Sequence, residues 1–143
     1  MESTSRTGSW DRLLLIVVAG VTLYALGLVL FGLAIGDQVF DRLGFGPDDG
    51  GIVGEGPREY VQLMLGVLGA VIVGWMMTIG AIVVGPLRRR EPWAWSAVVT
   101  AFVVWFVLDT GLSLILGFLG HALFNVGFAV ALAVPLLAIR NEL

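Results

Sequence analysis

One carboxylate lies well inside an apolar stretch of the sequence and is the residue best placed to do chemistry. Asp109 stands in the run VVWFVLDTGLS at positions 103–113, and no other Asp, Glu, Arg or Lys lies so deep in an apolar run. A carboxylate at membrane depth costs about 2.5–3.5 kcal/mol on insertion scales, so such residues usually face the interior of a helix bundle and have a partner. Asp109 is therefore expected either to carry a proton or a cation, or to lock its helix to a neighbour.

Depth along the predicted helices indicates which residues could be its partners. At about 1.5 Å of rise per residue, Tyr24 lies near the depth of Asp109 and Asn125 lies about one turn farther out. Thr110 follows Asp109 directly, and Ser113 continues the same helix face at i+4. The predicted intramembrane polar cluster consists of Asp109, Tyr24, Asn125, Ser113 and Thr110, with His121 at the outer rim. Without Asp109, Asn125 and Ser113 would be structural glue and His121 an interfacial residue.

Several kinds of site are excluded by residue types that the chain lacks. There is no cysteine and only one histidine, so disulfides, thiol catalysis, cysteine-ligated metals and multi-histidine metal sites are excluded. The sequence contains no Gly-rich phosphate loop and no nucleophile elbow, which argues against an enzyme. Net charge is −3 with no broad basic surface, so nucleic acid is not an expected partner. No cofactor and no metal ion is predicted.

Composition predicts that the elements carrying these residues lie in a lipid bilayer. Hydrophobic residues make up 58% of the 143 residues and charged residues 13%. Soluble domains carry roughly 25% charged residues, so this chain does not have enough polar side chains to cover itself in water. The expected fold is a single, all-α membrane domain, a four-transmembrane-helix bundle. Its predicted helices cover about 13–35, 58–84, 92–118 and 120–139, with an acidic loop at 36–57.

Proline and glycine mark the predicted ends of these helices. Pro57 and Pro92 suit the first turn of a helix, and Gly85-Pro86 ends the second one. The turn between the third and fourth helices is expected at 117–120, because the apolar run 93–139 is too long for one crossing and sufficient for two. Two alternatives remain open, namely a signal peptide in place of the first helix, and three crossings with a re-entrant segment.

Arginine placement predicts the orientation. Arg88, Arg89 and Arg90 lie between the second and third helices, on the same side as Arg6, Arg12 and Arg140 if the chain crosses four times. The positive-inside rule then places both termini in the cytoplasm, and we expect a multi-pass protein of the plasma membrane. The run Arg88–Arg90 is interpreted as a topology determinant that also suits anionic lipid head groups.

Small residues predict where the helices pack. Gly66, Ala70 and Gly74 are spaced by four, with Gly69 beside them. Such rows let two helix backbones approach closely, since burial of apolar surface does not drive association in lipid. The row is interpreted as packing within one chain, with a dimer motif as the alternative. The expected partners are the lipid bilayer and either a second copy or another membrane protein.

The second half of the chain resembles a known group of proteins. The motifs that carry the resemblance are Gly69-Ala70, Gly74-Trp75, REPWAW at 90–95, WFVLDT at 105–110, Ser113, Asn125 and Pro135-Leu136. They look like the uncharacterised four-helix integral membrane proteins of bacteria and archaea, and the layout is loosely similar to the DoxX-like group. The resemblance spans about 60–139, implies a four-helix bundle and supplies no catalytic residue. Small multidrug transporters carry their essential carboxylate in the first helix, where this chain has none.

Three functions remain in view. The first expectation is a structural or accessory component of a membrane complex, and the second is a proton- or cation-coupled transporter or channel that uses Asp109. The third is a membrane oxidoreductase partner of the DoxX-like kind. These functions require different environments for Asp109. In a transporter its side chain must face a hydrated cavity or an oligomer axis, whereas in an accessory protein it can be shielded from water and hydrogen-bonded.

Overall fold

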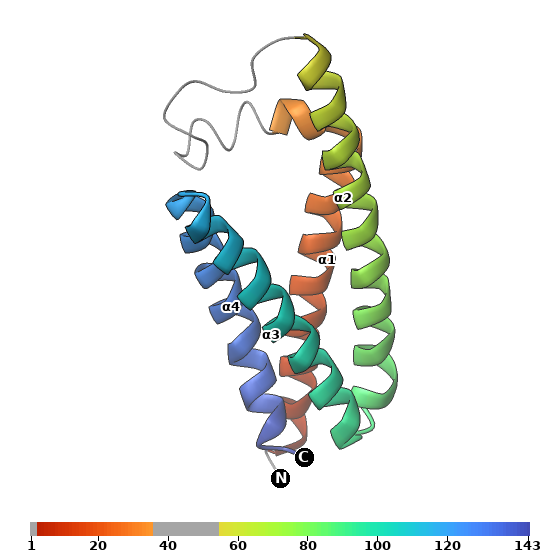
Figure 1. Ribbon diagram of the computed structural model, residues 1–143. Coiled ribbons are helices and arrows are strands. Elements are labelled where there is room, and N and C mark those ends of the chain that lie inside the picture. Colours follow the sequence, from red (N-terminus) through yellow and green to blue (C-terminus); the bar gives the residue numbers. More distant parts are fainter. Residues whose placement is uncertain (1–2, 36–54) are drawn as a thin grey trace.

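The computed structural model describes residues 3–35 and 55–143 and is all-helical over these ranges (Figure 1). Its elements are α1 (Ser3–Ile35), α2 (Glu55–Ile82), the short π-helix η2 (Val83–Leu87), α3 (Pro92–Ile115) and α4 (Leu119–Arg140). Within the described ranges, four helices are long and apolar enough to cross a membrane. The predicted all-α fold with four spanning helices is confirmed. Most of the predicted acidic loop, residues 36–54, lies outside the described residues.

The first helix is longer than its apolar run. α1 begins at Ser3, about ten residues before the predicted start, because the polar residues ahead of Leu13 continue the helical backbone beyond the apolar span. The regular helix is interrupted at Phe31, whose φ of −136° and ψ of 25° are not helical. Figure 1 shows the bend that results near the end of α1.

The second helix ends through a wider turn. A proline inside a helix lacks an N–H and clashes with the carbonyl four residues before it. Pro86 lies within η2, and the Glu91 N–H reaches the Pro86 carbonyl at 3.1 Å. The following turn contains Arg90 in the left-handed region, with φ of 58°. Helix α3 then starts at Pro92, at the predicted residue.

The turn between α3 and α4 is a glycine-capped helix end. Gly117 has φ of +82°, a conformation that side chains with a Cβ rarely adopt. The Phe118 N–H donates to the Ser113 carbonyl at 2.8 Å and the Gly117 N–H to Leu114 at 3.2 Å, which is the Schellman pattern. This motif ends α3 at Ile115, three residues before the predicted 118, and α4 starts at Leu119 instead of 120. It also removes the re-entrant alternative, since α3 and α4 are separate spans.

The helices form two close pairs, α1 with α2 and α3 with α4, and α1 also contacts α4. Figure 1 shows that the pairs meet at the end that holds both termini and η2, here called the terminus end. They spread apart toward the end that holds Ile35, Glu55 and the α3–α4 turn, here called the turn end. The buried apolar core includes Leu14, Val18, Met76, Ile79, Val83, Leu87, Ala94, Val98 and Ile139.

The closest helix contact is at one glycine of the predicted row. A Cβ on Gly69 would lie 2.5 Å from the Ala25 carbonyl oxygen of α1, so only glycine permits this approach. Gly66 and Gly74 face open space among the described residues, and Ala70 is exposed. At about 100° per residue, Gly66, Ala70 and Gly74 lie about 60–140° around the helix from Gly69, so the row runs beside the α1 contact and the described residues leave open space at Gly66 and Gly74.

A partly buried ion cluster joins three parts of the chain at the terminus end. Arg90 donates through Nη1 to Asp11 Oδ1 at 3.0 Å and through Nη2 to Glu142 Oε2 at 2.9 Å. The Arg90 and Asp11 side chains are only 19% and 9% exposed. Arg90 therefore ties α1 and the C-terminus to the α2–α3 turn, a role that the interpretation as a surface topology residue missed.

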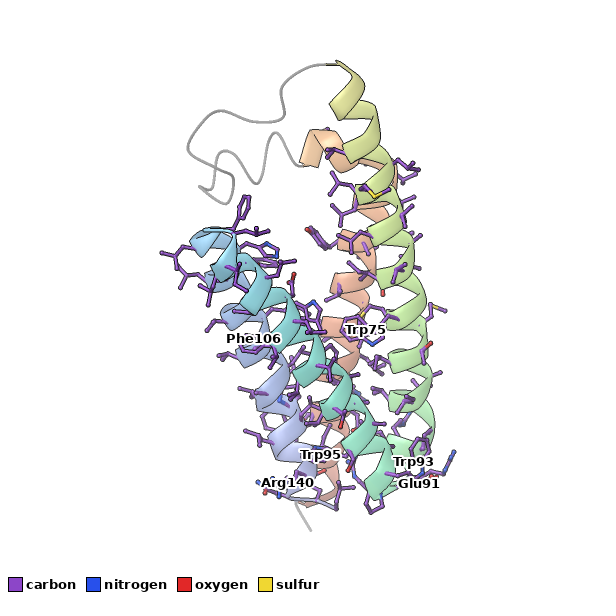
Figure 2. All side chains as sticks on the ribbon, viewed as in Figure 1. Trp75, Glu91, Trp93, Trp95, Phe106 and Arg140 are labelled. Atoms are coloured by element: carbon purple, nitrogen blue, oxygen red, sulfur yellow. The ribbon has the colours of Figure 1, made fainter. Side chains whose placement is uncertain are left out.

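Exposed aromatic and charged groups border the same end. Arg89 Nε and Trp93 Nε1 both donate to Glu91, each at 2.7 Å, and these hydrogen bonds hold the pKa of Glu91 below its ordinary value. Figure 2 shows Glu91, Trp93, Trp95 and Arg140 gathered at this end, whereas Trp75 lies farther along the bundle. Tryptophan at one level is typical of the interface between hydrocarbon and head groups.

Candidate functional site

Four of the six polar residues predicted from the sequence, Tyr24, Asp109, His121 and Asn125, line a cavity of about 430 Å³ between the two helix pairs. Residues of all four helices contribute to it. The lining consists of Val17, Gly20, Val21, Tyr24 and Leu28 from α1, Leu68, Ile72 and Trp75 from α2, Trp105 and Asp109 from α3, and His121, Phe124, Asn125, Phe128 and Ala131 from α4. The cavity lies where the two helix pairs begin to spread apart, and its walls carry several aromatic side chains.

Asp109 is the charged group of this cavity, and α4 holds it by two side chains. Asn125 Nδ2 donates to Asp109 Oδ2 at 2.8 Å, and His121 Nε2 lies 3.3 Å from the same oxygen. The other oxygen, Oδ1, accepts no hydrogen bond from any described residue. The Asp109 side chain remains 35% exposed, so it faces the cavity and is not enclosed between helices.

Asn125 has a buried acceptor with no partner. Its Nδ2 donates to Thr110 Oγ1 at 3.2 Å as well as to Asp109, so the carboxylate fixes which way the amide points. Its Oδ1 is buried and has no hydrogen-bond partner in the described part of the chain. A buried acceptor left unpaired costs about 1–3 kcal/mol. Because Oδ1 is buried, this acceptor lies behind the wall of the cavity and is not open to it.

His121 was placed at the outer rim as an interfacial residue, and the structure instead brings it into the site. Its ring is 30% exposed and stacks on Phe124 with centroids 6.3 Å apart. His121 and Asn125 are spaced by four, so α4 presents both to Asp109 on one face. That spacing is the signal in the sequence that identifies His121 as a partner.

Two members of the predicted cluster have other roles. Ser113 is buried, and its hydroxyl donates to the Asp109 backbone carbonyl at 2.7 Å, so it is satisfied within α3. Tyr24 lines the opposite wall of the cavity on α1 and makes no hydrogen bond to Asp109 within the described residues. The structure thus joins Asp109, Asn125, Thr110 and His121 directly, and adds Tyr24 across the cavity.

Aromatic rings line the cavity on the terminus-end side of Asp109. Trp105 packs against Trp75 with centroids 6.4 Å apart and against Phe128 at 5.4 Å, nearly edge to face. Trp75 in turn contacts Phe102 at 5.2 Å. Trp75, Phe102 and Phe128 were not predicted from the sequence as site residues, since scattered aromatics in apolar helices carry no periodic signal.

This geometry can bind a proton or a single small cation. The Asp109 carboxylate, whose Oδ1 has no hydrogen-bond partner among the described residues, and the neighbouring imidazole would hold a cation that carries N–H groups, and the aromatic faces of the cavity attract positive charge. No group of three potential metal ligands exists among the described residues.

The chain matches no protein-family model, and no curated protein or solved structure is significantly similar to it. The resemblance to uncharacterised four-helix proteins and to the DoxX-like group stays a prediction. The function of the protein is therefore inferred from the cavity itself.

Proposed function

We propose that the protein is a cation transporter of the plasma membrane in which Asp109 exchanges a proton for a small cation. The observation that carries the proposal is the position of Asp109 on the wall of a cavity of about 430 Å³, with 35% of its side chain exposed. A carboxylate that served only to lock helices together would be enclosed by its partners, because burial with full hydrogen bonding is the stable arrangement for a structural polar group.

Mutual exclusion of the two ligands provides the coupling. Ionised Asp109 attracts a cation, whereas protonated Asp109 is neutral and loses most of that attraction. Because both ligands need the same carboxylate, each one lowers the affinity for the other, as linkage requires. His121, at 3.3 Å from Oδ2, is positioned to accept the proton that a cation displaces.

We further propose that the terminus end faces the cytoplasm. Arg88, Arg89 and Arg140 lie at this end, where the positive-inside rule expects them. Asp109 lies on the turn-end side of Trp105 and would therefore receive its cation from outside the cell.

The first experiment is infrared titration of the carboxyl band of Asp109 in purified protein reconstituted into lipid. If Asp109 exchanges protons, its band changes reversibly with pH and shifts rapidly in D₂O. The band is assigned by its loss in Asp109→Asn, and Glu91→Gln, which removes an exposed carboxylate at the terminus end, leaves it unchanged. A band that neither titrates nor exchanges would identify a dry helix lock and refute the proposal.

Transport is then measured directly in proteoliposomes that contain a pH-sensitive dye. Sodium ions and a series of primary and quaternary amines are added outside, and proton movement is followed for each. We expect at least one of them to drive proton movement in the wild type and none in Asp109→Asn.

An accessory role in a membrane complex is the second candidate, and one observation favours it. Gly66, Ala70 and Gly74 form a row of small residues on α2 beside the α1 contact, with open space at Gly66 and Gly74 in the described structure. Such a row suits a helix from another chain. If the carboxyl band of Asp109 is silent, purification of crosslinked partners becomes the next step.

A further inference from the structure

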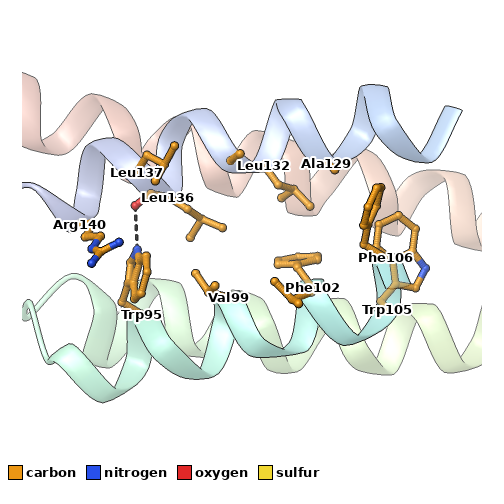
Figure 3. A pocket seen from close by; sticks show the side chains of 12 residues that line it. Trp95, Val99, Phe102, Trp105, Phe106, Ala129, Leu132, Leu136, Leu137 and Arg140 are labelled. Carbon is orange, nitrogen blue, oxygen red and sulfur yellow. Dashed lines mark hydrogen bonds between the residues drawn. The ribbon is translucent and has the colours of Figure 1, made fainter. Parts of the chain in front are cut away.

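A second cavity, of about 400 Å³, lies between α3 and α4 and is separate from Asp109 (Figure 3). Only residues of α3 and α4 line it, and several of them, such as Val103 and Leu137, are more than half exposed. The cavity is therefore a groove on the outer surface of the helix pair. Figure 3 shows Phe106 and Ala129 at one end and Trp95 and Arg140 at the other.

The groove is apolar over most of its length. Ala129 and Ala133, spaced by four on α4, leave the space that Phe102 and Phe106 flank from α3. The Trp95 indole N–H already donates to the Leu136 carbonyl at 2.8 Å, so this side chain is a fixed wall with no free donor. An empty groove would lack dispersion contacts along its walls. In a bilayer the groove is surrounded by lipid acyl chains, which are available to fill it.

Arg140 places a positive charge at one end of the groove. Its guanidinium lies over the Trp95 ring, 5.2 Å from the centroid. Arg90 is paired with Asp11 and Glu142, and Arg89 with Glu91, whereas Arg140 has no ion pair among the described residues. The charge of Arg140 is thus available to an anion at the level of the terminus end.

We propose that this groove binds one anionic phospholipid, with an acyl chain along α4 and the phosphate at Arg140. From Ala129 to Arg140 the helix rises about 16 Å at 1.5 Å per residue. One leaflet contributes about 15 Å of the roughly 30 Å hydrocarbon core, so the groove and the chain have matching lengths. A charge at the head-group end and none at the other is the polarity of a phospholipid, and the site is independent of transport through Asp109.

The test uses full-length, delipidated protein in detergent, titrated with phosphatidylglycerol or phosphatidylcholine of identical acyl chains. Bound lipid is counted by native mass spectrometry. The wild type should retain one phosphatidylglycerol about fivefold more tightly than phosphatidylcholine, the factor expected when one arginine contributes about 1 kcal/mol. Arg140→Gln should remove this preference. Arg88→Gln, an exposed arginine at the same end and outside the groove, should keep it.

A second pair of variants tests the groove itself. Ala133→Phe fills the groove and should weaken binding of both lipids about tenfold, whereas Val134→Phe, on the neighbouring exposed position, should not. If Arg140→Gln and Arg88→Gln reduced the preference for phosphatidylglycerol equally, the preference would come from the overall positive charge of this end, and the proposal would be overturned. Unchanged lipid binding in Ala133→Phe would overturn the proposal as well. A wild-type dimer that dissociates in Ala133→Phe would also overturn it, because the groove would then be occupied by a second copy of the chain.

Tryptophan fluorescence of the wild-type protein provides an independent test of lipid binding in the groove. Phosphatidylglycerol brominated near the end of its chain should quench tryptophan fluorescence more than equally brominated phosphatidylcholine, because Trp95 and Trp105 line the groove. The excess quenching should vanish in Arg140→Gln. Equal quenching by the two lipids in the wild type contradicts a specific site.

Discussion

Arg90 combines an unfavourable backbone conformation with ion pairs to two other parts of the chain at the terminus end. Its backbone adopts φ of 58°, which is unfavourable for a residue with a Cβ and costs on the order of 1–2 kcal/mol. Its guanidinium binds Asp11 and Glu142, and Nη1 also reaches the Leu87 carbonyl at 3.3 Å. The turn geometry directs this side chain inward between α1 and the C-terminal residues, and the ion pairs offset its backbone cost.

We expect Asp11→Asn to destabilise the protein by about 2 kcal/mol. Removing one member of a buried pair leaves the other charge desolvated, which costs about 3–5 kcal/mol at full burial and less here because Arg90 is partly exposed. The measurement is thermal unfolding in detergent micelles. Arg89→Gln, which breaks an exposed pair, should change stability by less than about 0.5 kcal/mol. A similar loss of stability in both variants would show that the Arg90 ion cluster does not stabilise the fold more than an exposed ion pair does.

Residue types predicted the polar site better than the ion cluster. A lone carboxylate in an apolar run limits its partners to polar residues at similar depth, so Asn125 and Thr110 were identified from Asp109. The Arg90 pairs join positions 11, 90 and 142, and no local spacing connects them. Tyr24 was placed at the correct depth, but its lateral distance from Asp109 depends on how far the helix pairs spread, which depth does not determine.

At the scale of the elements, the contact between α1 and α2 depends on Gly69. A side chain at this position would meet the Ala25 carbonyl, which is backbone and does not move aside as a flexible side chain would. Gly74 on the same helix faces open space, so it offers a matched control. The two glycines separate the cost of steric overlap from the general effect of replacing glycine in a helix.

Gly69→Ala is expected to lower the free energy of unfolding by about 2 kcal/mol, in the range of overpacking in a core. Gly74→Ala should leave it unchanged or raise it by up to about 1 kcal/mol, because alanine favours the helix. Both variants are compared by thermal unfolding under identical conditions. A Gly74→Ala variant as unstable as Gly69→Ala would mean that the outward face of α2 is itself a contact.

The length of each apolar run predicted the presence of a helix. The residues at the helix ends predicted where each helix begins or ends only in part. Pro92 begins α3 as predicted, because proline suits a first turn. The end of α3 was misplaced by three residues, since it depends on the hydrogen bonds around Gly117. Which glycine contacts α1 was also not predictable, because the row 66, 70 and 74 and the single position 69 are equally small.

At the scale of the whole molecule, both termini and the arginine turn share one end of the bundle (Figure 1). The absence of cysteine allows the orientation of this end to be tested with single introduced thiols. We expect Asn141→Cys to react with a membrane-impermeant maleimide only in inside-out vesicles. Asp48→Cys, in the acidic segment between α1 and α2, should react only in right-side-out vesicles. The reverse pattern would place the termini outside and invert the proposed direction of transport.

The position of Asp109 along α3 has an electrical consequence. It lies six residues from Ile115 and seventeen from Pro92, about 9 Å and 26 Å along the helix axis. A cation that enters from the turn end and stops at Asp109 crosses about a quarter of the transmembrane voltage drop. At about 2.3 kcal/mol per charge per 100 mV, that quarter amounts to about 0.6 kcal/mol, or roughly threefold in affinity. Binding would respond weakly to membrane potential, and most of the electrical work would fall on the later passage beyond Trp105.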